Sequence, residues 1–157
     1  MASLSQIRNA LAAQITAQCG ITCSPRMPDQ VNPPQIAILP GAPYAKYGLT
    51  LGEHTVAAGL PHVIPVATEY NLIVAVFASR ASSVEDAQDT VDTYLGFEPS
   101  TVITSVPEAI AFDPSLGSVV EYCECIQVQA YGDVEIAGQH YFQGRIVVSV
   151  SAHQALA

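Results

Sequence analysis

Three segments of the chain place apolar residues every three or four positions, which is the spacing of an amphipathic helix. They cover residues 4–18, 84–95 and 106–112, and a glycine or an Asp-Pro pair follows each of them. Each segment opens with a serine that has Gln or Glu three residues later, the capping-box pattern: Ser3/Gln6, Ser82/Glu85 and Ser105/Glu108. The pattern therefore predicts three helices with buried inner stripes.

Alternation of apolar and polar residues, or a continuous apolar run, indicates the strands. Residues 68–78 alternate at first and then continue as an apolar run, as in a strand covered on both faces. Residues 119–131 and 141–151 are expected to pair as a long antiparallel hairpin, with turn candidates at residues 132–133 and 137–138. The predicted inner face of the first hairpin strand comprises Val120, Tyr122, Ile126, Val128 and Ala130. Glu124 interrupts this face, and a bulge or a subunit contact would explain it.

Residues 28–43 contain five prolines around one short apolar run, residues 36–39. Pro33 and Pro34 favour extended conformations, so the chain enters this run already extended. Because proline has no amide hydrogen, Pro34 is expected at the start of a strand or at a sheet edge. Pro40-Gly41 then ends the strand.

The order of elements is helix, strand, long connection, strand, two helices and two strands, which predicts an α+β fold. We expect a mixed or antiparallel β-sheet with a long C-terminal hairpin and two to three helices packed on one face. Residues 1–157 are expected to form a single domain, because this length suits one hydrophobic core and no internal repeat is evident.

Two loops are candidates for contacts with partner proteins. The connection at residues 40–66 is long for a compact domain and has an apolar tip, and its candidate contacts are Tyr44, Tyr47, Leu49 and His54. We also expect a short strand at residues 56–58. The hairpin tip at residues 132–140 adds the candidates Asp133, Glu135 and His140.

Charge is scarce in this chain, since 12% of its residues are charged, half are hydrophobic, and the formal net charge is −9. Scarce charge beside long apolar runs indicates that partners cover part of the surface. The five basic residues do not cluster in any window, so a nucleic-acid-binding face is not expected. No signal peptide or membrane-spanning run is evident, and we expect a soluble protein made in the cytoplasm.

The titratable residues form no familiar catalytic or metal-binding motif. The four cysteines could be combined into a zinc site, but the second pair alternates on a predicted strand instead of a zinc knuckle. A disulfide between Cys19 and Cys23 would require an oxidising environment. Cys123, His140 and Asp133 could be assembled into a hydrolase triad, but no nucleophile motif accompanies them. We expect buried thiols, and no catalytic residue, cofactor or metal.

Acidic residues line one side of the second predicted helix: Glu85, Asp86, Asp89 and Asp92. Two interpretations remain open for them. They form a metal site or an acidic wall facing DNA, or they are a solvated helix face whose charge suits the helix N-terminus.

Six segments follow one another along most of the chain: SQIRNALAAQI, PDQVNPPQIAILPG, YNLIVAVFASR, EDAQDTVDTYL, SVPEAIAFDPSLG and YGDVEIAGQHYFQGRIVVSV. In this order they resemble the tail terminator family, the tail-completion proteins of long-tailed bacteriophages. Each segment alone is a turn, cap or core signal of low specificity, and the order carries the resemblance. Related neck and head-tail joining proteins look similar at this level.

The resemblance implies a virion structural protein, a small α/β subunit that assembles as a hexameric ring at the head-proximal end of the tail. Such a ring stops polymerisation of the tail tube and presents a surface to the head-completion (stopper) protein. Its implied partners are other copies of the chain, the major tail tube protein and the head-completion protein, with no membrane. Genomic DNA passes through the ring without sequence-specific binding.

The family contributes no catalytic residues. An acidic lumen would repel the DNA phosphates, and the candidates for it are Glu85, Asp86, Asp89 and Asp92. The alternatives are another neck or head-tail connector, a monomeric adaptor or chaperone, and a small metal-binding or cysteine-dependent enzyme domain.

Overall fold

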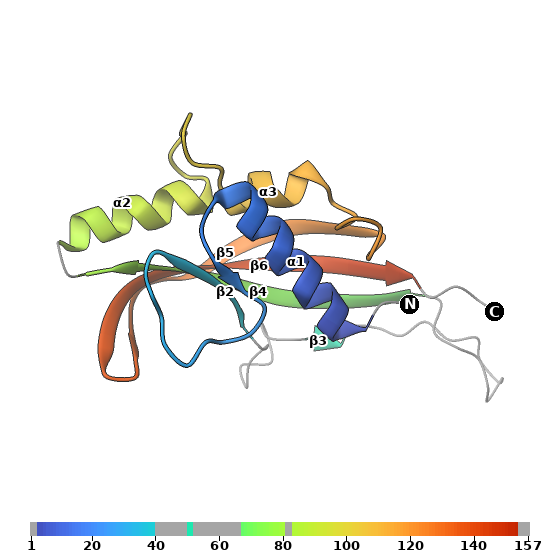
Figure 1. The fold of residues 1–157 in the computed structure, drawn as a ribbon, viewed down its shortest axis with the longest axis horizontal. Helices are drawn as coiled ribbons and strands as arrows, with labels where there is room; N and C mark the ends of the chain where they lie inside the picture. Colours follow the sequence, from blue (N-terminus) through green and yellow to red (C-terminus); the bar gives the residue numbers. More distant parts are fainter. Residues whose placement is uncertain (1–2, 40–49, 52–66, 81–82, 154–157) are drawn as a thin grey trace.

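The computed structural model describes residues 3–39, 50–51, 67–80 and 83–153 (Figure 1). Along the chain the elements are α1 (Leu4–Cys19), β1 (Cys23–Ser24), β2 (Gln35–Leu39), β3 (Thr50–Leu51), β4 (Ala67–Ser79), α2 (Val84–Leu95), α3 (Val106–Phe112), β5 (Tyr122–Ile136) and β6 (Gln139–His153). The predicted order of elements is confirmed, and two short strands, β1 and β3, are added to it. The short strand expected at residues 56–58 lies outside the described residues.

The strands form one mixed sheet, with six strands in the described part of the chain. The order across the sheet is β1-β2-β4-β6-β5, and β3 pairs with β4 at Tyr70 and Asn71, beyond the stretch that β2 occupies. β1 runs parallel to β2, whereas the other pairs are antiparallel. Pro34 immediately precedes β2, as its missing amide hydrogen requires.

All three helices cover one face of the sheet, as predicted (Figure 1). Ile7, Leu11 and Ile15 of α1 are fully buried against this face, together with Val91 of α2 and Ile110 of α3. The capping boxes predicted at Ser3 and Ser105 are formed. α2 spans the predicted residues 84–95, but its N-cap is Ser83, one residue after the predicted Ser82, and Ser83 accepts a hydrogen bond from the Asp86 amide.

The opposite face of the sheet carries a second, smaller apolar cluster. Its buried members come from β2, β4 and the segment before β2: Val31, Ala37, Leu39, Ile73, Ala75 and Phe77. The end of the β5–β6 hairpin turns away from the helices and packs on this cluster through Val134, Ile136 and Tyr141 (Figure 1). β4 is therefore covered on both faces along its apolar run, as predicted.

The inner face predicted for the first hairpin strand is correct at Val120 and Val128, which lie in the helix-side core, and wrong at Tyr122, Ile126 and Ala130, which are exposed. β5 contains two bulges that shift its alternation. Register shifts occur between Cys125 and Gln127 and between Gln129 and Gly132, each adding one residue to β5 relative to β6. Each extra residue reverses the alternation that follows it. The side chains that face the helices are consequently Cys123, Cys125, Val128 and Tyr131. Glu124 lies on the exposed outer side with Tyr122 and Ile126, each of which is 50% exposed.

Candidate interaction surfaces

The predicted acidic residues of α2 lie on its outer side but are directed toward two different parts of the molecule. Glu85, Asp89 and Asp92 are separated by four and three positions and form one stripe. Asp86 instead lines a shallow depression beside Pro33 and Pro34. We call Glu85, Asp89 and Asp92 the acid stripe. Its acids form no ion pair within the described residues, which leaves its charge uncompensated.

Tyr131 fixes the direction of the acid stripe. Its phenol donates a hydrogen bond to Asp92, and its ring contacts Phe97 and Phe142 edge-on. Partial burial and this hydrogen bond raise the pKa of Tyr131, so the phenol remains a donor at neutral pH. Because Tyr131 belongs to β5, the stripe is turned toward the β5 edge of the sheet.

The predicted contact residues of the hairpin tip are brought close together and are exposed. Asp133 forms an ion pair with Arg80, which follows β4, at 3.3 Å. His140 Nε2 lies 3.9 Å from Glu135 Oε2 across the hairpin. Solvent-exposed ion pairs such as these contribute only ~0–1 kcal/mol to stability, so their side chains can exchange partners at little cost. The two-residue turn is Ala137-Gly138, the second predicted candidate.

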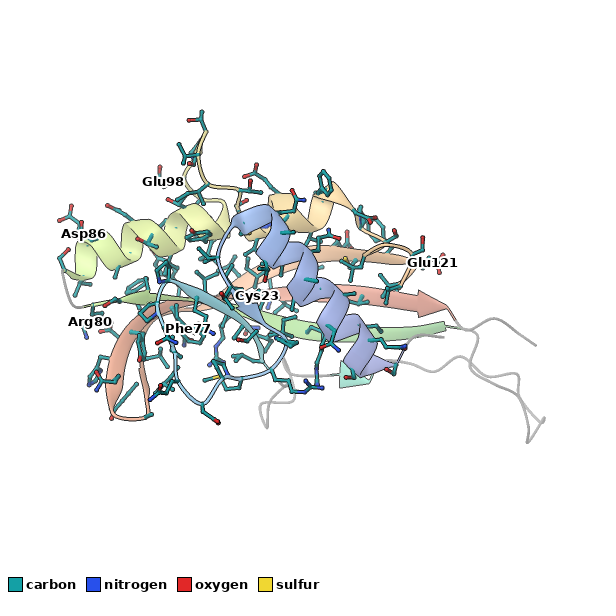
Figure 2. All side chains as sticks on the ribbon, in the orientation of Figure 1. Cys23, Phe77, Arg80, Asp86, Glu98 and Glu121 are labelled. Atoms are coloured by element: carbon teal, nitrogen blue, oxygen red, sulfur yellow. The ribbon has the colours of Figure 1, made fainter. Side chains whose placement is uncertain are left out.

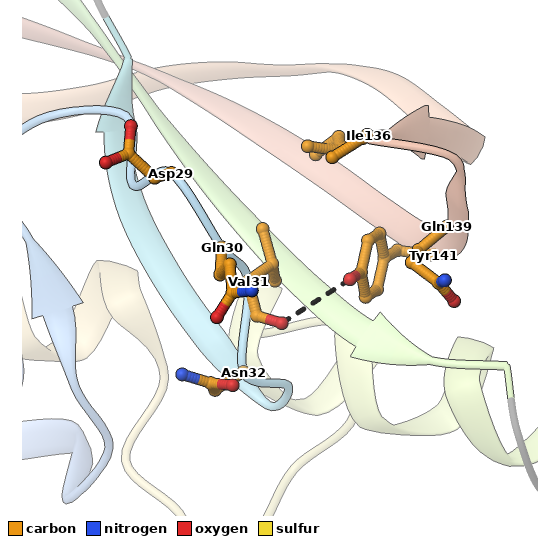
Figure 3. A pocket seen from close by; sticks show the side chains of 8 residues that line it. Asp29, Gln30, Val31, Asn32, Ile136, Gln139 and Tyr141 are labelled. Carbon is orange, nitrogen blue, oxygen red and sulfur yellow. Dashed lines mark hydrogen bonds between the residues drawn. The ribbon is translucent and has the colours of Figure 1, made fainter.

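A polar cavity of about 310 Å³ lies between the hairpin tip and the segment before β2 (Figure 3). Asp29, Gln30 and Asn32 line one side, and Gln139 and Tyr141 line the other. The Tyr141 hydroxyl donates to the Val31 carbonyl at 3.4 Å and ties the two sides together. Local sequence patterns do not reveal this cavity, because Val31 and Tyr141, which join its two sides, are 110 positions apart in the chain.

A second cavity, of about 250 Å³, is lined among the described residues by Arg8, Arg26, Met27 and Ile38. We call it the arginine pocket. Arg26 Nη2 donates to Ser5 Oγ at 3.0 Å, while Arg8 Nε is buried without a hydrogen-bond partner. No local sequence pattern links these arginines, since they are eighteen positions apart and belong to different parts of the fold.

The four cysteines are free and three of them are buried in the helix-side core. Burial raises the pKa of Cys19, Cys23 and Cys125 to about 12 and that of Cys123 to about 11. The thiolate is the nucleophilic and metal-binding form, so these sites disfavour both kinds of chemistry. Cys23, labelled in Figure 2, belongs to β1 and is buried in the helix-side core. Across the described ranges, no three His, Cys, Asp or Glu side chains are placed to share a metal ion.

Some of the predicted contact residues cannot be placed. Tyr44, Tyr47, Leu49 and His54 lie outside the described residues.

Large exposed apolar side chains occur on the helix side of the fold: Phe97 is 54% exposed, Val102 91% and Phe112 71%.

No family model matches the chain, and no curated protein shows significant similarity to it. None of the helices in the described part of the chain has the length and apolar character needed to cross a bilayer.

Proposed function

We propose that this chain is a tail terminator, a structural protein of a long-tailed virion. In this proposal it forms a ring at the head-proximal end of the tail tube, and the ring is hexameric, as the resemblance implies. The ring stops tube polymerisation and offers an attachment surface to the head-completion protein. The chain has no catalytic role in this proposal.

The observation that carries the proposal is the order of the six family-like segments. They supply α1, β2, β4, α2, α3 and the β5–β6 hairpin, which are the elements that build the sheet and its helix layer. The segments therefore support one coherent α+β subunit of the kind that the resemblance implies. This support comes from order and architecture together, because each segment alone has low specificity.

The surface gives independent support for an assembly role. Phe97 and Val102 lie between α2 and α3, and Phe112 ends α3, so the helix side carries several exposed apolar side chains. Exposing such groups to water is unfavourable, and contact with a partner removes that penalty. The hairpin tip offers exposed charged groups as a second contact region.

The charge of the chain suits a ring through which DNA passes. Its formal net charge is −9, with 14 Asp and Glu residues against five Lys and Arg residues. Carboxylates near a DNA channel repel the phosphates and prevent adhesion during passage.

Tube assembly in the presence of the chain tests the proposal. The major tail tube protein of the same virus is polymerised with and without the purified chain, and tube lengths are measured by electron microscopy. We expect shorter tubes that carry the chain at one end. Tubes of unchanged length without bound chain would contradict the proposal. Chain bound at the head vertex of virions, with tube length unaffected, would instead identify another neck or connector protein.

A further inference from the structure

The arginine pocket concentrates positive charge that has no counter-ion in the described part of the chain. It holds two of the four arginines, Arg8 from α1 and Arg26 from the segment after β1. Ion pairs within the described ranges involve Arg80 and His140, and neither pocket arginine takes part in one. Two guanidinium groups beside an apolar wall of Met27 and Ile38 suit a carboxylate, which arginine binds in a bidentate geometry.

The size of the pocket favours side chains over a small-molecule ligand. Its volume is about 250 Å³, below the range of about 300–1,000 Å³ that is usual for ligand sites. One or two acidic side chains fit such a space. If the bound residue is Glu, its methylene groups would lie against Met27 and Ile38. If it is Asp, which has a shorter side chain, the helix that carries it would make this contact.

The chain itself carries a group of this kind, the acid stripe of α2. Glu85 and Asp89 are exposed and four positions apart, an arrangement in which like charges repel along a helix. Asp92 accepts a hydrogen bond from Tyr131 within the same copy. Glu85 and Asp89 are therefore the members of the stripe that can bind a partner. A pair of guanidinium groups would remove this repulsion.

The two surfaces lie at opposite edges of the sheet. The arginine pocket includes Ile38 of β2 and residues adjoining β1, while the acid stripe is turned toward β5. The starts of α1 and α2 also lie at opposite ends of the molecule in Figure 1. The pocket and the stripe are therefore placed to meet between copies. A contact between different patches on two copies repeats head to tail, and it closes into a ring when the rotation allows.

We infer that the arginine pocket of one copy binds the acid stripe of the next, with Arg8 and Arg26 opposite Glu85 and Asp89. This inference rests on the proposed ring and assigns the surfaces that form it. A second copy is the occupant best supported here, because the chain has only five basic residues and a net charge of −9. Copies with that charge repel one another unless their few positive groups meet the acids.

Charge reversal tests the inference, with native mass spectrometry of the purified chain as the readout. Arg26→Glu and Asp89→Arg each place like charges in the contact, whereas Glu98→Arg makes the same charge change as Asp89→Arg on the loop between α2 and α3 (Figure 2). We expect each of the first two variants to weaken self-association at least ~tenfold. Glu98→Arg should assemble like the wild type. Circular dichroism checks that every variant is folded.

An equimolar mixture of the two reversed variants provides the decisive comparison. In alternating order, each pocket meets a stripe of opposite charge, so the mixture should regain the assembly that each variant alone has lost. Self-association of the wild type should also weaken as salt rises, since the screening length is about 10 Å at 0.1 M.

Several outcomes would overturn the inference without touching the proposed function. Reversed variants that assemble like the wild type would show that the ring uses other surfaces. A loss for Arg26→Glu that the mixture does not restore would assign the pocket to a different acidic partner. A wild type that is monomeric at every salt concentration would also exclude this contact, while the tube-length assay would still decide the proposed function.

Discussion

Gly144→Ala tests how closely α2, which carries the acid stripe, rests on β6. Gly144 pairs with Val76 and faces the helices. A Cβ atom at this position would lie 2.4 Å from Leu95 Cδ1 and 3.1 Å from Val91 Cγ1. Carbon atoms pack best at about 3.5–4.0 Å, and both neighbours are buried, so the added methyl group must displace Leu95 or the helix.

The expected effect is a net loss of stability. Overpacking of a well-packed core costs ~1–3 kcal/mol. Replacing glycine within a strand restores ~0.5–1 kcal/mol, because alanine loses less backbone entropy on folding. The free energy of unfolding should therefore fall by up to ~2.5 kcal/mol in a urea titration, with an unchanged m-value.

A second substitution separates crowding from other causes. Leu95→Ala removes the crowded methyl group and by itself should cost ~2–5 kcal/mol. In the Gly144→Ala background it should cost less, with a coupling of ~0.5–3 kcal/mol. Gly20→Ala serves as a control, since its Cβ would meet nothing within 4 Å and its cost comes from the positive φ of 77° alone. A Gly144→Ala midpoint at or above wild type, or strictly additive effects, would refute the reasoning.

Three further predictions concern single groups. Tyr131→Phe keeps the ring contacts but removes the hydrogen bond to Asp92, so stability in urea should fall by ~0.5–1.5 kcal/mol; an unchanged midpoint would mean that this bond adds nothing. Hydrogen bonds from the Ser115 hydroxyl and, to a smaller extent, the Gly117 amide lower the pKa of Asp113. Thermal denaturation should therefore show that Asp113→Asn is most destabilising at neutral pH, and that the difference from wild type vanishes as the pH falls through the lowered pKa. A difference that does not depend on pH would contradict this prediction. Burial raises the pKa of Cys19 from 9.0 to about 12. As the pH rises above 9.0, the thiol ionises in the unfolded chain before it does in the folded chain, so the free energy of unfolding should decline. Cys19→Ala should reduce this decline, and an identical decline in the variant would contradict the prediction.

The helices, most strands and the hairpin could be predicted from the sequence because their signals are local. A capping serine acts on an amide three residues away, and the two central residues of a hairpin turn adopt positive φ at Ala137 and Gly138. The inner face of β6, with Phe142, Ile146 and Val148, follows from alternation alone. These features require no knowledge of the rest of the fold.

The bulges of β5 and the two cavities depended on tertiary contacts. A bulge forms where cross-strand pairing and helix packing together favour an extra residue, and alternation along one strand does not contain that information. Likewise, Arg8 and Arg26 meet because α1 and the segment after β1 pack side by side over β2. The sequence by itself determined the elements and their caps, since both depend on neighbouring residues. Only the tertiary structure decided which charged groups come together, because that depends on how distant elements pack.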